Sequence, residues 1–164
     1  MSQAAPQRGE PLKDRLRALN DAGDVDGFAR LVQSASDAEL AEVMSGDDGR
    51  EVLDTIFDQM PGRLRADQVE GVEGVLRWRV TGRPGADGDD VYEVAIREGR
   101  CTVSRGEHED PRTTMVVDPV SFVKLIGGAS SPAKLLLRRR LRVRGDVTFA
   151  MRSEGFFEKP VARR

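Results

Sequence analysis

Cysteine and histidine are almost absent from this sequence, which contains one of each among its 164 residues. A single cysteine, Cys101, excludes an internal disulfide, and a single histidine, His108, excludes a metal centre built from several imidazoles. A cysteine–histidine dyad would require these two residues to converge. We therefore expect no metal, no cofactor and no catalytic site.

Long hydrophobic runs are also absent. No segment approaches the roughly 18 uninterrupted apolar residues that a membrane span needs, and the polar amino terminus MSQAAPQRGEP lacks the apolar centre of a secretion signal. The carboxy-terminal PVARR does not match the Ser-Lys-Leu peroxisomal signal. These features predict a cytoplasmic protein.

Neither sign of charge dominates, because 26 Lys and Arg oppose 28 Asp and Glu and leave a formal net charge of -2. Domains that bind nucleic acid are typically strongly basic, so no nucleic-acid partner is expected. A chain of this length with 38% hydrophobic residues can bury a core. We expect one main fold, with or without a helical extension.

The amino-terminal part of the sequence has the apolar spacing of amphipathic helices. The third of these segments opens with Ser36 and Glu39 at the spacing of a capping box. The sequence MPG ends the fourth, because proline cannot continue a helix. The predicted helices cover residues near 12–19, 25–32, 36–45 and 52–60.

The period changes to two in GVLRWRVTG, where Leu76, Trp78 and Val80 alternate with arginines. This alternation is typical of a strand with one wet face. Residues 92–96 alternate in the same way, and EGR leads into CTVS, so three strands of an antiparallel meander are predicted. TTMVV and LRVRG supply a fourth and a fifth strand of one sheet.

Two helices are predicted between the fourth and fifth strands, because Asp118 and Ser131 each precede a proline at the first helical position. A last helix follows the fifth strand in GDVTFAM, with Val147, Ala150 and Met151 as its expected buried stripe. Helices that interrupt and follow an antiparallel sheet define an α+β fold class.

The order and spacing of these segments resemble a known family. WRVTG, YEVAIREGRCTV, TTMVVDPVSFVKLIGG, the Pro132 helix and LRVRGDVTFAM resemble the sterol carrier protein 2 (SCP2) domain, with Phe122, Gly127 and Gly145 among the recurring anchors. The helix LDTIFDQMPG resembles the lead-in of bacterial members that carry an extra amino-terminal helical segment. Two departures are Lys134, where small apolar residues are usual, and Arg139, where a glycine is common.

The resemblance implies a five-stranded, mainly antiparallel sheet that helices cover on one face, preceded by a short helical extension. We place the extension at residues 1–46 and the SCP2-like lipid-binding domain at residues 47–160. Members of the family bind a fatty acid, acyl-CoA, sterol or phospholipid in an apolar tunnel between sheet and helices, and mostly lack catalysis. The expected function is therefore that of an intracellular lipid carrier.

A lipid tunnel can be built from ordinary core residues, because each buried CH₂ group contributes about 0.8 kcal/mol. Plain core packing is the competing interpretation for each candidate. The pair of phenylalanines in EGFFEKP is open to two interpretations: it plugs the tunnel mouth, or it pins the terminus. The candidate lipid-binding residues are Trp78, Tyr92, Val94, Phe122, Ile126, Leu136, Phe149, Met151, Phe156 and Phe157.

The arginine run after LLL is open to four interpretations. In one, Arg140, Arg142 and Arg144 form the solvent-exposed face of a strand, which strand alternation alone explains. A nucleic-acid binding site is disfavoured, because no aromatic residues lie between the arginines. A transient contact with anionic membrane through Arg138, Arg139 and Arg140 is a further hypothesis. Docking of the acidic third and fourth helices on this run is another.

The alternative to a lipid carrier is a non-catalytic interaction or accessory module with a fully packed SCP2-like core. In this alternative the helical extension recruits a protein partner, whose identity the sequence does not indicate.

Overall fold

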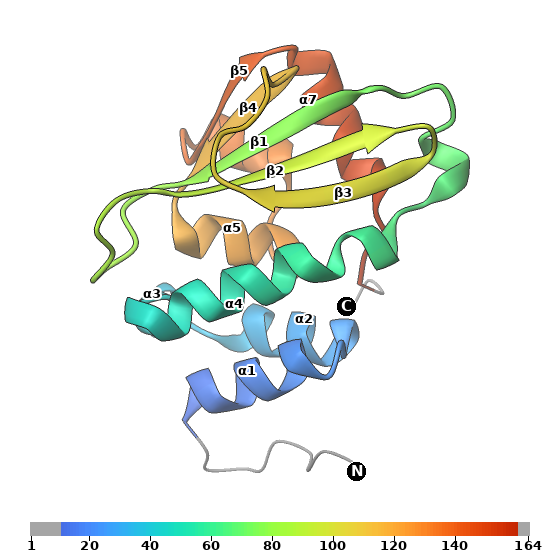
Figure 1. The fold of residues 1–164 in the computed structure, drawn as a ribbon. Coiled ribbons are helices and arrows are strands. Elements are labelled where there is room, and N and C mark those ends of the chain that lie inside the picture. Colours follow the sequence, from blue (N-terminus) through green and yellow to red (C-terminus); the bar gives the residue numbers. More distant parts are fainter. Residues whose placement is uncertain (1–10, 161–164) are drawn as a thin grey trace.

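The computed structural model describes residues 11–160, which form a five-stranded mixed sheet with helices on one face (Figure 1). The predicted α+β class is confirmed. The strands are β1 (Gly74–Val80), β2 (Asp90–Arg97), β3 (Arg100–Arg105), β4 (Thr113–Val117) and β5 (Leu141–Gly145). The helices are α1 (Leu12–Asp21), α2 (Val25–Ser34), α3 (Asp37–Val43), α4 (Gly46–Gln59), α5 (Pro119–Ile126), α6 (Pro132–Leu137) and α7 (Val147–Ser153). Short 3-10 turns are η1 (Pro61–Arg63), η2 (Ala66–Gln68) and η3 (Glu154–Phe156).

The sheet has the order β3-β2-β1-β4-β5, and the predicted meander of β1, β2 and β3 is antiparallel. A two-residue turn joins β2 to β3, and its Glu98 and Gly99 both have positive φ, as a tight hairpin turn requires. β4 is parallel to β1, whereas β5 is antiparallel to β4. The alternating apolar residues of all five strands face the helices, so the predicted strand faces are correct.

The segment 106–112 connects the edge strand β3 to β4 across the outer face of the sheet. Glu93 on β2 lies beneath it, 2% exposed, opposite Arg77 on β1. The guanidinium of Arg77 donates to the Glu93 carboxylate at 2.7 Å and to the backbone carbonyl of Glu109 at 2.6 Å. The backbone N–H groups of His108 and Glu109 also donate to Glu93. This pair therefore attaches the crossover to the sheet.

Burial by itself would raise the pKa of Glu93. Hydrogen bonds from the Arg77 side chain and from the two backbone N–H groups of the crossover outweigh that effect, and the pKa lies below the ordinary value of 4.5. A carboxylate with a lowered pKa contributes stability above its unfolded pKa, and that contribution is lost as the pH falls through the folded pKa.

Helix α4 begins at Gly46, earlier than the predicted start near residue 52, and the other helices begin where the sequence predicted. The Asp118 side chain accepts the Ser121 N–H at 3.0 Å, and the Ser131 hydroxyl accepts the Lys134 N–H at 3.2 Å. Each proline follows its cap at the first helical position, where no N–H is needed. The capping box at the start of α3 is also present. No helix within residues 11–160 is long and apolar enough to cross a bilayer.

Four aromatic rings form a continuous stack between the sheet and the helices. Phe57 of α4 stacks on Tyr92 of β2, with ring centroids 4.0 Å apart, and on Phe122 of α5 at 5.3 Å. Phe122 then meets the edge of Trp78 on β1 at 5.3 Å. Stacks of this kind add to the hydrophobic burial of the rings. They fill the space between α4, α5 and the β1–β2 part of the sheet.

Helices α1, α2 and α3 lie on the side of α4 and α5 that faces away from the sheet (Figure 1). Leu16, Phe28 and Leu40 are buried there, in one hydrophobic cluster with the residues of the sheet. The described part of the extension is thus a second helical layer on the same core. The domain boundary near residue 46 stays a prediction, and residues 1–10 of the extension lie outside the described part.

One predicted buried stripe is wrong at one of its three positions, whereas Ala150 is buried and Met151 packs against the core as predicted. Val147 of α7 is 51% exposed, whereas Phe149 and Ser153 are buried together with Ala150. The reason is tertiary: the Phe149 ring lies beneath the guanidinium of Arg112, 4.1 Å from the ring centroid, on the side of the helix that faces β4. Complete burial of the Phe149 ring favours this rotation of the helix, which the short sequence pattern did not indicate.

We predict that Glu93→Gln destabilises the fold by about 3 kcal/mol at neutral pH, because it leaves Arg77 without its buried partner. Urea denaturation at pH 7 and pH 4 measures the change, and the variant should lose less further stability below about pH 4.5 than the parent does. Glu109→Gln is the control, since Glu109 forms an exposed pair with Arg97 and should cost less than about 1 kcal/mol. Equal losses in the two variants would contradict this assignment.

Candidate binding cavity

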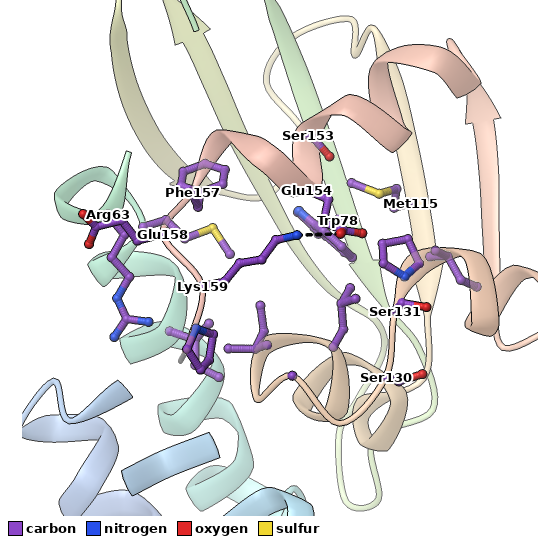
Figure 2. Close-up of a pocket in the computed structure, with 18 of the residues that line it drawn as sticks. Arg63, Trp78, Met115, Ser130, Ser131, Ser153, Glu154, Phe157, Glu158 and Lys159 are labelled. Atoms are coloured by element: carbon purple, nitrogen blue, oxygen red, sulfur yellow. Dashed lines mark hydrogen bonds and ion pairs between the residues drawn. The ribbon is translucent and has the colours of Figure 1, made fainter. Parts of the chain in front are cut away.

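A cavity of about 400 Å³ lies beside the aromatic stack, between the inner face of the sheet and the helical layer. Figure 2 shows Trp78 and Met115 of the sheet on one side of it and the carboxy-terminal segment on another. Cavities that bind small molecules are typically about 300 to 1,000 Å³ and mostly apolar. The apolar lining residues are Ile56, Met60, Leu76, Trp78, Met115, Leu125, Ile126, Pro132, Leu141, Ala150, Phe157 and Pro160.

Small side chains explain why the space stays open. Ala150 and Ser153 on α7 and Gly128, Ser130 and Ser131 in the turn between α5 and α6 all border the cavity. None of these side chains can reach far across the gap between helix and sheet. The large rings of the same interface are instead packed against one another in the aromatic stack. The helical layer is therefore held at a distance that the cavity residues do not fill.

Charged side chains lie at the rim of the cavity. Lys159 extends over the cavity to Glu154, and the two form an ion pair at 2.5 Å (Figure 2). Arg63 and Glu158 lie at another side of the rim. Partial burial lowers the pKa of the Arg63 guanidinium, and the nearby Glu158 carboxylate opposes part of that effect. The rim thus offers both signs of charge above an apolar interior.

The carboxy-terminal segment is clipped to the chain that follows α4. The Arg65 N–H donates to the Phe156 carbonyl at 2.7 Å, and the Glu158 N–H donates to the Arg63 carbonyl at 2.8 Å. Between them, Leu64 pairs with Phe157 in an antiparallel bridge. These bonds hold residues 156–158 beside the cavity.

The two phenylalanines of this segment have different roles. Phe156 is 2% exposed and lies 5.7 Å from Phe149, between ring centroids, so it pins the segment to α7. Phe157 is half-buried and lines the cavity. Of the two interpretations that the sequence left open, pinning of the segment applies to Phe156, and a plug at the cavity mouth stays a prediction for Phe157.

The structure places three of the ten candidate residues at this cavity, namely Trp78, Ile126 and Phe157. The others belong to the core beside it or pack against it. The fully or nearly fully buried ones are Tyr92, Val94, Phe122, Phe149 and Phe156. The partly buried ones are Leu136 and Met151. Contact of any of the ten with a ligand stays a prediction.

Sequence reasoning missed several lining residues. Met115 and Leu141 lie on inward strand faces, and the alternation of β4 and β5 could have suggested them. The rim residues Arg63 and Lys159 carry no local signal that points to a cavity. Gln33 of α2 also lines it, and its amide donates to the Gly127 carbonyl at 3.1 Å. The extension therefore contributes one residue to the cavity wall.

The two residues considered for catalysis, Cys101 and His108, each contact groups that belong to the framework of the fold. Cys101 lies on β3 against the core, and burial raises the pKa of its thiol to about 11, so the thiol stays protonated at neutral pH. The His108 ring contacts the backbone carbonyl of Arg105 at 2.5 Å, in the crossover loop. Within residues 11–160, no group of three metal-ligating side chains is placed to hold an ion.

A family model covers most of this architecture. The model described as the SCP-2 sterol transfer family matches residues 53–158, from within α4 to the clipped carboxy-terminal segment. No curated protein matches the sequence significantly.

Solved structures with the same fold include sterol carrier proteins. Sterol carrier protein 2 from Yarrowia lipolytica, in the apo form, is 18% identical over 62% of this chain and 86% of its own, with a TM-score of 0.53. Palmitated sterol carrier protein 2-like 2 from Aedes aegypti is 19% identical over 66% of this chain and 96% of its own, with a TM-score of 0.50.

The match to a third solved structure extends into the helical extension of this chain. The stereoselective inverting sec-alkylsulfatase Pisa1 from Pseudomonas sp. is 15% identical over 90% of this chain, with a TM-score of 0.56. That match leaves about 16 of the 164 residues uncovered, so it includes most of residues 1–46. This chain covers 30% of the sulfatase chain. At this identity the likeness shows a shared fold.

We predict that Phe156→Ala destabilises the fold by about 3 kcal/mol, because it empties a fully buried ring site. Phe157→Ala should cost less than about 1.5 kcal/mol, because that ring is half-buried and borders an opening. Urea denaturation of the two variants makes the comparison, each serving as the control for the other. Equal losses would show that both rings are packed alike.

Proposed function

The chain belongs to the SCP-2 sterol transfer family, and from that premise we propose that it binds an elongated lipid in the cavity between sheet and helices and carries it. The lipid class is broad: fatty acid, acyl-CoA, sterol or phospholipid. One observation supports this proposal above all others. A cavity of about 400 Å³ with a largely apolar lining stands where a fully packed core would have side chains.

A fold neighbour is consistent with this proposal. The Aedes aegypti protein with the same fold is described as palmitated. Palmitate is an elongated apolar chain with one polar end, which is the shape that a cavity with an apolar interior and a charged rim accepts. We infer the same kind of ligand for this chain.

Desolvation supplies the binding free energy in this proposal. Each buried CH₂ group contributes about 0.8 kcal/mol, so a chain of about 16 carbons offers on the order of 10 kcal/mol before costs. Association costs an estimated 4 to 15 kcal/mol, and micromolar affinity falls within that balance. No charged anchor is needed, and the polar end of the ligand would lie at the mixed-charge rim.

We expect no catalysis from this chain. The thiol of Cys101 is protonated at neutral pH, and its nearest surroundings are apolar core residues. Lys159 and Glu154 at the rim pair with each other, so neither side chain is a free base. Lipid binding by desolvation requires neither.

A second candidate function is an accessory role, in which the lipid is presented to a separate enzyme. The partial match to the alkylsulfatase favours it, because the fold of this chain occurs there as 30% of a larger chain.

Mass spectrometry of the protein purified under native conditions distinguishes lipid binding from a fully packed interaction module. A co-purifying lipid supports either lipid role, and its absence together with a negative titration supports the packed module.

We predict that a brominated fatty acid quenches the fluorescence of Trp78 and that the quenching saturates at micromolar concentration. Trp78 is the single tryptophan, is 7% exposed and lines the cavity, so quenching requires the bromine to enter. Ala150→Phe places a ring in the cavity and should weaken binding at least about tenfold. Ala133→Phe, at an exposed position of α6, is the matched control. Unchanged affinity in Ala150→Phe would place the ligand elsewhere.

We predict that affinity rises about fourfold for each CH₂ added to a series of medium-chain fatty acids, because about 0.8 kcal/mol per group corresponds to that ratio. The affinity should stop rising once the chain exceeds the length of the cavity. Isothermal titration calorimetry with the acids and the matching alcohols measures both trends. A strong preference for the acids with little dependence on length would indicate binding by charge at the rim.

A further inference from the structure

Unopposed positive charge is concentrated in one segment of this protein. Residues 119–145 contain seven Lys and Arg and no Asp or Glu. The formal net charge of the whole chain is -2, so this segment carries +7 and the remainder carries -9. Six of the seven basic residues lie in α6, β5 and the turn between them, namely Lys134, Arg138, Arg139, Arg140, Arg142 and Arg144. We call the exposed residues from 134 to 144 the α6–β5 corner.

The charges of the α6–β5 corner have no counterions among the residues that the structure describes. Within residues 11–160 none of its six basic side chains forms an ion pair or a side-chain hydrogen bond, and all six are exposed. By contrast, Arg77, Arg79 and Arg97 on the same sheet each pair with a carboxylate. The acidic helices α3 and α4 are also paired elsewhere: Lys124 contacts Asp37, and Lys13 contacts Asp48. The acidic helices therefore do not dock on the arginine run within the described chain.

An apolar side chain stands among these charges. Leu137, the last residue of α6, is 85% exposed, the most exposed large hydrophobic residue of the described chain, and Arg138 follows it directly. Water around a leucine is unfavourable, and burial of this side chain would gain free energy. A partner that uses both features of the corner therefore offers negative charge together with an apolar interior.

The backbone of the corner has an unfavourable conformation at Arg139, whose side chain is exposed. Arg139 has a φ of +60°, where helices usually end with glycine, and the Arg140 N–H donates to the Leu135 carbonyl across this turn at 2.8 Å. A non-glycine residue in this conformation is unfavourable. The fold therefore tolerates a local cost and presents an additional guanidinium at the corner.

The corner is connected to the binding cavity through shared elements. Ser131 and Pro132, at the start of α6, and Leu141, at the start of β5, line the cavity. β5 is an edge strand, and Figure 1 shows it at the end of the molecule away from α1. A surface that binds the corner would thus contact the same two elements that form one wall of the cavity.

We propose that the α6–β5 corner docks the protein on an anionic lipid bilayer, with the arginines on the headgroups and Leu137 inserted beneath them. A bilayer offers negative charge and hydrocarbon together, which matches both features of the corner. Single-stranded nucleic acid fits less well, because residues 123–148 contain no aromatic side chain on which a base could stack. The acidic surface of a second copy would satisfy the arginines but would leave Leu137 in water.

This docking goes beyond the proposed lipid binding and can be tested separately from it. The full chain is mixed with vesicles of phosphatidylcholine alone and of phosphatidylcholine with phosphatidylserine, and binding is measured by co-sedimentation. We expect binding that requires phosphatidylserine and weakens as salt is added. Equal binding to both vesicles, or to neither, would overturn the proposal.

Substitutions in the α6–β5 corner test whether this surface binds the vesicles. Arg138→Gln with Arg140→Gln should weaken vesicle binding about 25-fold, since each basic residue near an anionic surface is worth about fivefold. The matched control is Arg30→Gln with Arg100→Gln, which removes two exposed arginines from α2 and from the opposite sheet edge. Leu137→Ser should weaken binding about tenfold. An equal loss in the control pair would show that only net charge matters and would overturn the assignment.

Arg139→Gly separates docking from stability. This variant should bind vesicles about fivefold less tightly. Its urea midpoint should be unchanged or higher, because glycine suits a positive φ. Lipid binding in the cavity, measured by quenching of Trp78, should stay the same in all corner variants, since none of the substituted residues lines the cavity.

Two other partners give distinct results. If a single-stranded oligonucleotide binds more tightly than the anionic vesicles and loses affinity in the arginine variants, the corner is a nucleic-acid site and the proposal is wrong. If sedimentation velocity at low salt shows a dimer that the same variants dissociate, and vesicles do not bind, the corner is an interface between copies. Failure of docking with intact quenching of Trp78 would leave the proposed lipid binding standing.

Discussion

The spacing between the sheet and its helical cover is the constraint on which the rest of the structure depends. The stacked rings of Tyr92, Phe57 and Phe122 meet Trp78 and hold α4 and α5 at the distance that large aromatic side chains require. Beyond Trp78 several of the facing residues are small, such as Ala150 and Ser153, and the same distance leaves a cavity of about 400 Å³. Packing on one side of Trp78 thus creates the opening on the other, because side chains in a close-packed interior do not spread to fill such a gap.

The outer face of the sheet is organised by charge. The crossover from β3 to β4 runs over Glu93, whose carboxylate is satisfied by Arg77 and by two backbone N–H groups of the crossover itself. Arginines on β1 and β2 are therefore neutralised within the fold, whereas Arg142 and Arg144 on β5 have no carboxylate within reach in residues 11–160. The two halves of one sheet face consequently differ in electrostatic character. The charges on β1 and β2 stabilise the topology, and the charges on β5 are free to bind an external anion.

The described part of the extension, residues 11–46, packs on the same core as the family fold. Leu16, Phe28 and Leu40 are buried in the same cluster as the sheet residues, and Gln33 reaches the wall of the cavity. The matches to the two sterol carrier proteins cover about two thirds of this chain, whereas the alkylsulfatase match extends over 90% of it. The second helical layer therefore recurs together with the sheet in a larger chain. Its burial against α4 and α5 gives a physical reason for that recurrence.

The sequence by itself determined the strands with their faces and the starts of most helices, but not the buried face of α7. Period-two alternation predicted that Leu76 and Trp78 point to the core, and Asp118 and Ser131 predicted where two helices begin, because these signals are local. It could not determine which apolar side chains border an opening. Phe122 and Ile126 lie one turn apart on α5, and Phe156 and Phe157 are neighbours, yet in each pair only the second lines the cavity. Whether a side chain fills space or borders it depends on what lies opposite, and only the tertiary structure decides that.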